Sequence, residues 1–377
     1  AAAGARAVAH ERGARAARPL GSGVPGRQAW LRWAAALAVG TAAGYACMLL
    51  RTPIPWMLGP LFSLALLRVL GADVAAPLPA RYVGQWIIGT SLGLYFTPVV
   101  VHEVAGLWYL LVAGAVFAIA LGYVSGVALA RLADLDRTTG IFASVPGGAA
   151  EMATLGERFG GRVDRIAAAQ SLRILIVVAI VPGAITALDI HGSEPYVPGA
   201  SAFVAGGFAL RVAAPLAGSA VFQWLKMANA FVLGSLAVAI PLTALEVDLS
   251  SMPPIVSNAG QCLLGCALGS RFQPDFMRGA RRFVGAVATT VLLSIALAAA
   301  FGVALAWLAG QDAATLVLGN APGGIAEMCI TAKVLQLGVP LVTAFHVTRL
   351  VVLLLATPAV FVHARRWHRA REARRSG

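Results

Sequence analysis

Two glutamates share an unusual setting, because each follows a Pro-Gly-Gly motif inside an apolar stretch. They are Glu151 and Glu327. Pro suits the first turn of a helix and Gly loosens the backbone before it, so a helix that begins here directs free N–H groups and its positive dipole end into the apolar layer. Discontinuous helices bind anions in this way, and a nearby carboxylate can bind Na⁺ or carry a proton. The alternative is a carboxylate that only complements the dipole at an ordinary, wet helix start. The motif residues are Pro146, Gly147 and Gly148, and Pro322, Gly323 and Gly324.

Two arginines, Arg173 and Arg349, lie inside the apolar segments that follow these motifs. Each stands about eight to ten residues into its segment, or ~12–15 Å along a helix, which is roughly half the ~30 Å thickness of the hydrocarbon layer. An unpaired Arg at that depth is expensive, so we expect a partner, and Glu151 and Glu327 are the available carboxylates. The pattern predicts that these four side chains converge near the bilayer midplane. There the arginines either bind an anion or form a purely structural ion pair.

Five further polar side chains are candidates for the same site. His346 shares a helix face with the second arginine, and it either titrates near neutral pH or is a buried, hydrogen-bonded structural residue. Gln85 and Gln261 lie beside Gly-x-x-x-Gly motifs, whose glycines allow close helix packing; these glutamines either face a cavity or bond between helices. Ser144 and Asn320 precede the prolines, so they either cap helices or line a site.

The chain contains two copies of one unit, because its punctuating residues recur at a fixed offset. Gly84–Pro98 matches Gly260–Pro274 without a gap, at an offset of 176 residues. The two Pro-Gly-Gly-x-x-Glu-Met motifs and the two arginines recur at the same offset. A repeat at one fixed period indicates a duplicated structural unit.

A duplicated membrane unit with paired Pro-Gly-Gly-x-x-Glu-Met segments resembles the AbrB-type membrane protein family of Gram-negative bacteria. The resemblance covers about Trp30 to Val362 and does not extend to the small DNA-binding protein of the same name. It implies an architecture of duplicated membrane units. It also brings two functional labels, a regulator of gene expression and an ammonia monooxygenase.

Composition indicates lipid as the solvent. Apolar residues make up 59% of the 377 residues and charged residues 12%, against roughly 45–50% and about 25% in soluble chains. Apolar runs of about 20 residues recur along the chain, the length that spans a bilayer. The net charge of +13 comes from arginines in the tails and short loops, which is typical of positive-inside anchoring rather than nucleic-acid binding. The sequence predicts an all-α integral protein of the bacterial inner membrane.

Each unit has six apolar segments, and the fifth carries the Pro-Gly-Gly motif. Either all twelve segments cross and the repeats are parallel, or each fifth segment is broken or re-entrant, leaving about ten transmembrane helices and inverted repeats. In the second topology twelve of fifteen loop Lys and Arg residues fall inside, against five in the first. The positive-inside rule therefore favours inverted repeats with both termini in the cytoplasm. We expect a disordered basic leader at 1–29, repeats at 30–190 and 200–364, and a basic cytoplasmic tail at 365–377.

These features predict an ion-coupled secondary transporter for a small anionic solute. The alternative is a membrane-embedded regulator of gene expression that acts indirectly, since no DNA-binding motif or cytoplasmic domain is evident. An enzyme is not expected, because six scattered histidines do not form the cluster that copper or iron needs. The four cysteines fit packing better than a metal site or disulfides. No cofactor is expected. Expected partners are the lipid bilayer, the solute and either Na⁺ or H⁺, without direct nucleic-acid binding, and a homo-oligomer is left open.

Overall fold

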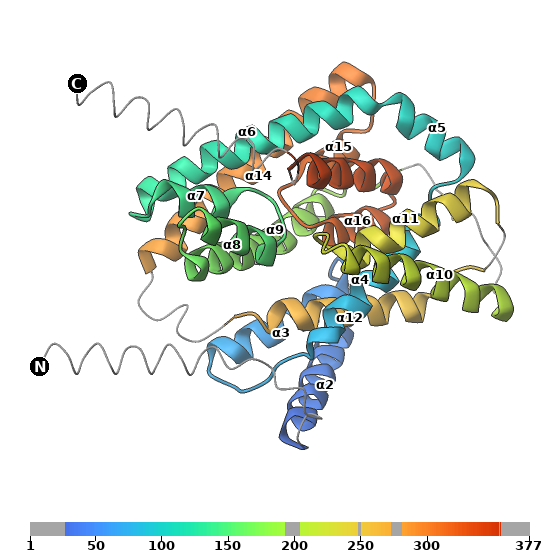
Figure 1. Ribbon diagram of the computed structural model, residues 1–377, viewed down its shortest axis with the longest axis horizontal. Coiled ribbons are helices and arrows are strands. Elements are labelled where there is room, and N and C mark those ends of the chain that lie inside the picture. The colour runs from blue at the N-terminus through green and yellow to red at the C-terminus, as the bar shows by residue number, and fades with distance from the viewer. Residues whose placement is uncertain (1–26, 193–203, 248–249, 273–280, 354, 356–377) are drawn as a thin grey trace, which may run out of the picture.

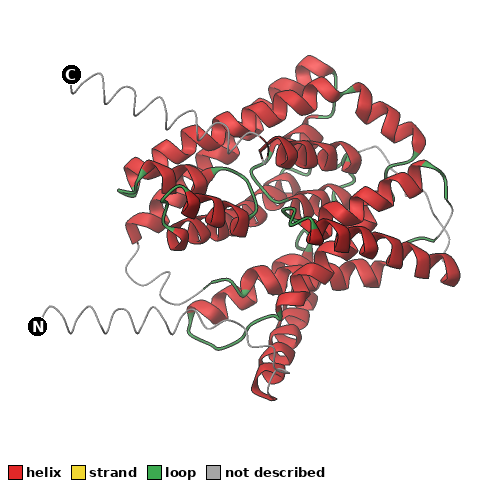
Figure 2. Cartoon of the chain, in the orientation of Figure 1, coloured by secondary structure: helices red, strands yellow, loops and turns green. Residues whose placement is uncertain are grey.

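The computed structural model describes residues 27–192, 204–247, 250–272, 281–353 and 355. Within these ranges every regular element is a helix (Figure 2), which confirms the expected all-α fold class. The first half contains α2 (Arg27–Leu49), α3 (Pro55–Val69), α4 (Leu78–Gly93), α5 (Pro98–Gly106), α6 (Trp108–Leu132), α7 (Arg137–Ser144), α8 (Ala149–Arg158) and α9 (Val163–Ala187). The second half contains α10 (Ala205–Trp224), α11 (Ala230–Ala244), α12 (Pro254–Gly269), α14 (Arg281–Ala309), α15 (Ala313–Asn320), α16 (Ile325–Val334) and a last helix, Val339–Leu353. The expected leader, the expected basic tail and the connection near residue 195 lie almost wholly outside the described residues.

Three helices, α6, α9 and α14, are long and apolar enough to cross a membrane. α4 and α5 make a fourth candidate span if they are taken together, although the chain bends by 93° between them. α3 and α11 are apolar but have 15 residues each, or about 22 Å, which is less than the ~30 Å hydrocarbon layer. The protein is therefore a multi-pass membrane protein. The described residues hold fewer long spans than the ten crossings expected, because several apolar segments are short or bent.

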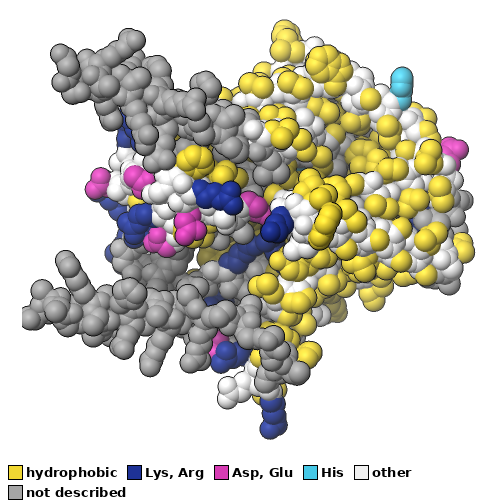
Figure 3. Space-filling model, in the orientation of Figure 1, with side chains coloured by type: hydrophobic (Ala, Val, Ile, Leu, Met, Phe, Trp, Pro, Cys, Tyr) yellow, Lys and Arg dark blue, Asp and Glu magenta, His cyan; other side chains and the backbone are white. Residues whose placement is uncertain are grey.

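Charged and apolar side chains gather on different parts of the surface. Figure 3 shows Lys, Arg, Asp and Glu concentrated at one end of the face it presents, and a mainly apolar surface over the rest. Large apolar side chains such as Trp307 and Leu308 of α14 are 84% and 74% exposed. Apolar surface on this scale needs a lipid or protein cover, which agrees with a membrane location.

α4 and α12 cross in direct contact at two glycines that match in the repeat. A Cβ added to Gly84 would lie 2.7 Å from the carbonyl oxygen of Gly260, so the helices approach more closely than any side chain would allow. Gly84 also lies against Leu264, whereas Gly260 lies against Ile87. Along α4 from Gly84 to Ile87, the contact in α12 moves back from Leu264 to Gly260, so α4 and α12 are antiparallel. α3 packs on α12, and α11 packs on α4, which joins the two halves of the chain.

Gly84→Ala should destabilise the protein, because the added methyl group would collide with the backbone of α12. Overpacking of this kind typically costs about 1–3 kcal/mol. Gly285→Ala in α14 is the matched control, because a Cβ there meets nothing within 4 Å and Ala is the better helix former by roughly 0.5–1 kcal/mol. Melting temperatures in detergent should fall for the first variant and hold or rise for the second. Equal melting temperatures would contradict the close crossing.

α6 and α14 form a second antiparallel pair. The Ser125 and Ser294 hydroxyls are 2.8 Å apart, and the rings of Phe117 and Phe301 stack with centroids 3.9 Å apart. Along α6 from Phe117 to Ser125, the contact in α14 moves back from Phe301 to Ser294, as expected for antiparallel helices. In Figure 1 the short helices α7, α8, α15 and α16 lie between this long pair and the group formed by α3, α4 and α12.

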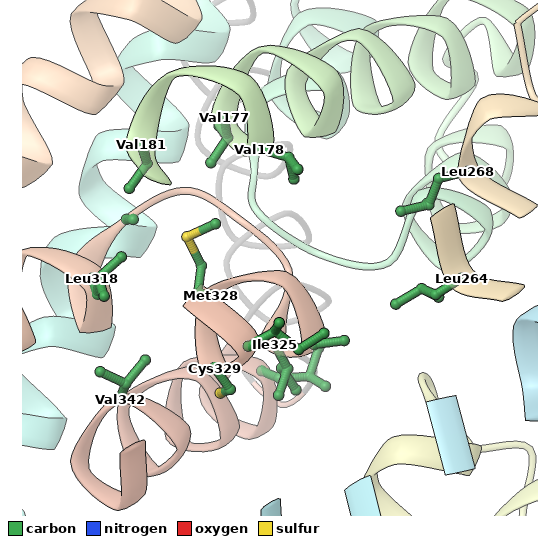
Figure 4. Close-up of a cluster of buried hydrophobic side chains, with 14 of the residues drawn as sticks. Val177, Val178, Val181, Leu264, Leu268, Leu318, Ile325, Met328, Cys329 and Val342 are labelled. Carbon is green, nitrogen blue, oxygen red and sulfur yellow. The ribbon is translucent and has the colours of Figure 1, made fainter. Parts of the chain in front are cut away.

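A buried apolar cluster surrounds the short helices of the second half. Figure 4 shows Val177 and Val178 of α9 on one side of Met328 in α16, and Leu264 and Leu268 of α12 facing Ile325 from another side. Met328 is fully buried, and Leu264 is 2% exposed. Because lipid is as apolar as these side chains, close van der Waals packing rather than the hydrophobic effect holds the cluster together.

Candidate functional site

Each Pro-Gly-Gly motif interrupts a helix. α7 ends at Ser144 and α8 begins at Ala149, with Gly148 as its N-cap; α15 ends at Asn320 and α16 begins at Ile325, with Gly324 as its N-cap. The first member of each pair has eight residues and the second has ten. The breaks therefore lie where the sequence predicts them. They leave two helix N-termini and two helix C-termini near one another.

The first broken pair returns to its starting point. Asp136 caps α7 by accepting a hydrogen bond from the Thr139 amide at 2.8 Å. The Thr139 hydroxyl in turn accepts the amide of Arg162, which follows α8, at 2.8 Å. The start of α7 and the end of α8 are thus joined at one point, so this segment folds as a hairpin.

The second broken pair repeats the same ties at the 176-residue offset. Asp312 caps α15 by accepting the Thr315 amide at 2.7 Å, and the Thr315 hydroxyl accepts the amide of Gly338 at 3.0 Å. Gly338 follows α16 as Arg162 follows α8. Both broken segments are therefore closed hairpins with the same hydrogen bonds.

Arg349 binds the backbone of the second break. Its Nη1 donates to the Ala321 carbonyl and its Nη2 to the Gly323 carbonyl, both at 2.6 Å. The guanidinium thus satisfies carbonyls that the end of α15 leaves free. Arg349 is 5% exposed. Its expected partner was a glutamate, and that expectation is wrong: the partners are carbonyl groups.

Arg173 occupies the matching position at the first break but is held less closely. Its Nη1 donates to the Val145 carbonyl at 3.0 Å, with longer contacts of 3.5 Å to the Ser144 and Gly147 carbonyls. Its Nε is buried and has no hydrogen-bond partner within the described ranges. No ion pair joins Arg173 to Glu151 or any other carboxylate among the described residues.

Both glutamates stand third in their helices, and each carboxylate turns back onto its own helix N-terminus. A Cβ on Gly148 would collide with the Glu151 carboxylate, and one on Gly324 with that of Glu327. This placement complements the helix dipole. The two differ in burial, because Glu327 is 5% exposed whereas Glu151 is only partly buried, although its Oε2 atom is buried without a partner.

The remaining candidates divide between structural and cavity positions. His346 is fully buried and its Nε2 lies 3.0 Å from the Leu318 carbonyl. This placement agrees with the second of its two alternatives, a buried, hydrogen-bonded structural residue. Gln85 donates to Asn229 Oδ1 at 3.3 Å and lines a cavity. Gln261 is buried in α12 and lies outside both cavities described below. Ser144 and Asn320 line the second of these cavities.

A cavity lies where the N-termini of α8 and α16 face α4 and α12. We name it the amide-side cavity, and it encloses about 530 Å³ of space free of atoms, part of it open to solvent. Its lining consists of Arg81, Gln85, Gly147, Gly148, Ala149, Arg173, Ile174, Asn229, Val232, Leu264, Leu268, Arg271, Gly324, Ile325, Ala326 and Glu327. Its lining therefore comes from both Pro-Gly-Gly segments and from both halves of the chain.

Positive charge dominates the amide-side cavity. Arg81, Arg173 and Arg271 line it together with one carboxylate, Glu327. Glu327 attracts all three arginines electrostatically, and Arg271 is also attracted by Glu151. Because two helix N-termini add partial positive charge, the lining suits an anion with two or more oxygens.

Three polar residues of this cavity are not among the candidates that the sequence gives: Arg81, Arg271 and Asn229. Arg81 and Arg271 belong to the fifteen loop Lys and Arg residues of the positive-inside count, which interprets them as anchors at the membrane surface. They meet because α4 and α12 are antiparallel, which brings the start of one helix to the end of the other. Comparing the repeats does not reveal them, since Arg271 corresponds to Tyr95 in the first copy. Asn229, whose amide oxygen accepts from Arg81 at 3.4 Å, carried no sequence signal.

Long apolar helices, two interrupted hairpins and a cavity lined by arginines define a multi-pass membrane protein with an internal polar site. The chain belongs to the family described as "AbrB: Transition state regulatory protein AbrB", whose model matches residues 56–365. This confirms the predicted family.

Two curated relatives are similar along nearly their whole length. "Uncharacterized protein YhjN" of Bacillus subtilis (strain 168) is 25% identical over 353 residues, which cover 86% of this chain and 91% of that protein. "Putative regulator AbrB" of Escherichia coli (strain K12) is 20% identical over 333 residues, which cover 88% and 95%.

Proposed function

We propose that the protein is a secondary transporter of a small anionic solute, driven by a gradient of Na⁺ or H⁺. The observation that carries the proposal is the amide-side cavity, where Arg81, Arg173 and Arg271 meet the N-termini of α8 and α16. Broken helices that direct their N-termini at an anion are a recurring binding arrangement in secondary transporters. The buried carboxylate of Glu327 gives the cavity a group that can carry the coupling ion.

We further propose that the two halves are inverted repeats with five crossings each. Inverted repeats require matched helices to run in opposite directions, and both α4 with α12 and α6 with α14 do so. The closed hairpins also support re-entrant segments, because a full crossing would put the two ends of α7–α8 on opposite sides of the membrane. One more contact agrees: the Gly192 amide donates to the Leu335 carbonyl at 3.0 Å, which joins loops that parallel repeats would separate.

This topology predicts that the loop at 157–165 is cytoplasmic and that the loop beginning at Asp189 is periplasmic. Its far end, Glu194, lies outside the described residues. Single cysteines introduced at Arg162 and Asp189 should react with a membrane-impermeant thiol reagent from opposite sides of the membrane. Both positions are exposed, so labelling should be fast. Labelling of both from the reversed sides would restore twelve crossings and parallel repeats.

The transport proposal is tested with purified protein in liposomes. Labelled phosphate, sulfate and mono-, di- and tricarboxylates are offered under an imposed pH gradient and, separately, under an imposed Na⁺ gradient. We expect uptake of at least one anion class with one gradient, and none in liposomes without protein. Failure of every anion under both gradients would contradict the proposal.

The family's description and the name of the Escherichia coli relative favour a second candidate, indirect regulation of gene expression. In that case the same cavity would sense an anion rather than carry it. Comparing transcripts of a deletion strain, of the complemented strain and of a strain with Arg271→Gln separates the two. A transcript change that depends on Arg271, together with inert liposomes, would favour regulation.

A further inference from the structure

A second cavity lies on the other side of the two helix breaks. We name it the carbonyl-side cavity, because it adjoins the C-terminal ends of α7 and α15. Ser144 and Asn320 line it from those ends, and Thr290 and Ser294 line it from α14. The proposed function assigns no role to this cavity.

One charged side chain is common to both cavities. Arg173 lines the amide-side cavity and the carbonyl-side cavity, whereas Arg349 lines only the second. Arg173 thus stands in the wall between the two spaces, at the break of the α7–α8 hairpin. Its burial is nearly complete, with 4% exposed.

The two matched arginines differ in how much hydrogen-bonding capacity remains. Arg349 makes two bonds of 2.6 Å, which are at the short end for a guanidinium and a carbonyl. Arg173 makes one bond of 3.0 Å and two contacts of 3.5 Å, and its Nε finds no acceptor among the described residues. A buried donor without a partner is costly, so an additional hydrogen-bond acceptor next to Arg173 would stabilise its guanidinium.

The carbonyl-side cavity contains a second unmet group. Asn320 donates through Nδ2 to the Leu316 carbonyl at 2.9 Å, but its buried Oδ1 has no partner in the part of the chain that the structure describes. Asn320 is 4% exposed. Arg173 and Asn320 both line this cavity and are nearly buried with incompletely satisfied polar groups, so the cavity wall offers hydrogen-bonding capacity to a polar occupant, water or a solute.

We infer that Arg173 is an anion ligand shared by the two cavities, so that a small carboxylate or phosphate-like anion passes between them along this side chain. Arg349 keeps its bonds to the backbone and holds the second hairpin in place. A guanidinium suits this role, because its planar donors can exchange carbonyl acceptors for the oxygens of an oxyanion. This inference rests on the proposed transport function and adds a route and a ligand to it.

The test uses charged thiol reagents, so it needs neither a known solute nor measurable transport. Ser144→Cys reports on the carbonyl-side cavity and Ala149→Cys on the amide-side cavity. Each is labelled with the anionic sulfonatoethyl and the cationic trimethylammonioethyl methanethiosulfonate, with the unmodified chain as the blank for the four native cysteines. The measured quantity is the ratio of the anionic to the cationic labelling rate.

We expect Arg173→Gln to lower this ratio at least tenfold at both reporters. Arg349→Gln should lower it only at Ser144→Cys, and Arg349→Lys replaces that variant if it does not fold. A fall at one reporter only after Arg173→Gln would overturn the shared-ligand inference, as would a reporter that neither reagent reaches. Inert liposomes combined with the expected labelling would instead count against transport alone, so the two failures are distinguishable.

Discussion

Replacing Arg81 or Arg271 by Gln should weaken anion binding at least tenfold while the protein remains folded. A hydrogen bond to a charged group contributes roughly 1.5–3 kcal/mol, and about 1.4 kcal/mol corresponds to a factor of ten. Both arginines line the amide-side cavity from the ends of α4 and α12. Among the described residues, Arg81 donates one long side-chain hydrogen bond, 3.4 Å to Asn229 Oδ1, so little stability depends on it.

The measurement is the dissociation constant of the anion identified by the liposome screen, with uptake rate and melting temperature beside it. Arg158→Gln is the control, because Arg158 is exposed at the end of α8 and lines neither cavity. Unchanged affinity in both cavity variants would move the anion site elsewhere. A melting temperature that falls with affinity would indicate a structural role for these arginines.

Glu327→Gln and Glu151→Gln should abolish activity with little change in stability. Gln keeps the size of Glu and most of its hydrogen-bonding capacity, but it cannot take a negative charge or carry a proton. The arginines of the breaks bond to carbonyls rather than to these carboxylates, so neither substitution leaves a hydrogen bond of Arg173 or Arg349 unmade. For Glu151 the expected loss is mainly that of the helix-dipole interaction, typically about 0.3–1 kcal/mol. Glu327→Gln also removes the attraction of Glu327 to the arginines of the amide-side cavity, so its loss should be the larger of the two.

The glutamate test compares melting temperature in detergent with uptake in liposomes for each variant. Glu157→Gln, on the exposed face of α8, serves as the control. Glu327 is buried and lines the cavity whereas Glu151 is partly buried and does not, so activity retained by Glu151→Gln alone would restrict the site to Glu327. A stability loss that tracks the activity loss would favour a purely structural role, and full activity in both variants would remove the glutamates from the site.

Local patterns in the sequence predicted the elements of the site, but not its contacts. Pro and two Gly in a row marked both helix breaks, and Gly148 and Gly324 serve as the N-caps. The expectation that Pro stands in the first turn was wrong, because Pro146 and Pro322 lie two residues before these caps, outside the helices. The burial of Arg173 and Arg349 also followed from their depth in apolar segments. Their partners did not, because a carboxylate is visible in a sequence whereas the free carbonyls of a broken helix appear only once the break is built.

The cavity depends on tertiary packing that no local pattern encodes. Arg81 and Arg271 come from positions that do not match in the two repeats, and only the antiparallel crossing at Gly84 and Gly260 brings them together. The sequence left two alternatives for His346, a residue that titrates near neutral pH and a buried, hydrogen-bonded structural residue. Its placement against Leu318 required the position of the last helix relative to α15.

The packing of α3 on α12 and of α11 on α4 determines when the protein can assemble during synthesis. A ribosome releases the first half of the chain before its partners exist: α12 begins 199 residues after the start of α3, and α11 begins 152 residues after the start of α4. At roughly 5–20 residues per second these intervals are about 8–40 s. A helix can wait in lipid because its backbone hydrogen bonds are internal. Insertion and folding are therefore separate events for α3 and α4. A chain that stops after α9 would be inserted in the membrane, but the glycines of α4 that contact α11 and α12 would have no helix packed against them. We expect such a chain to be degraded.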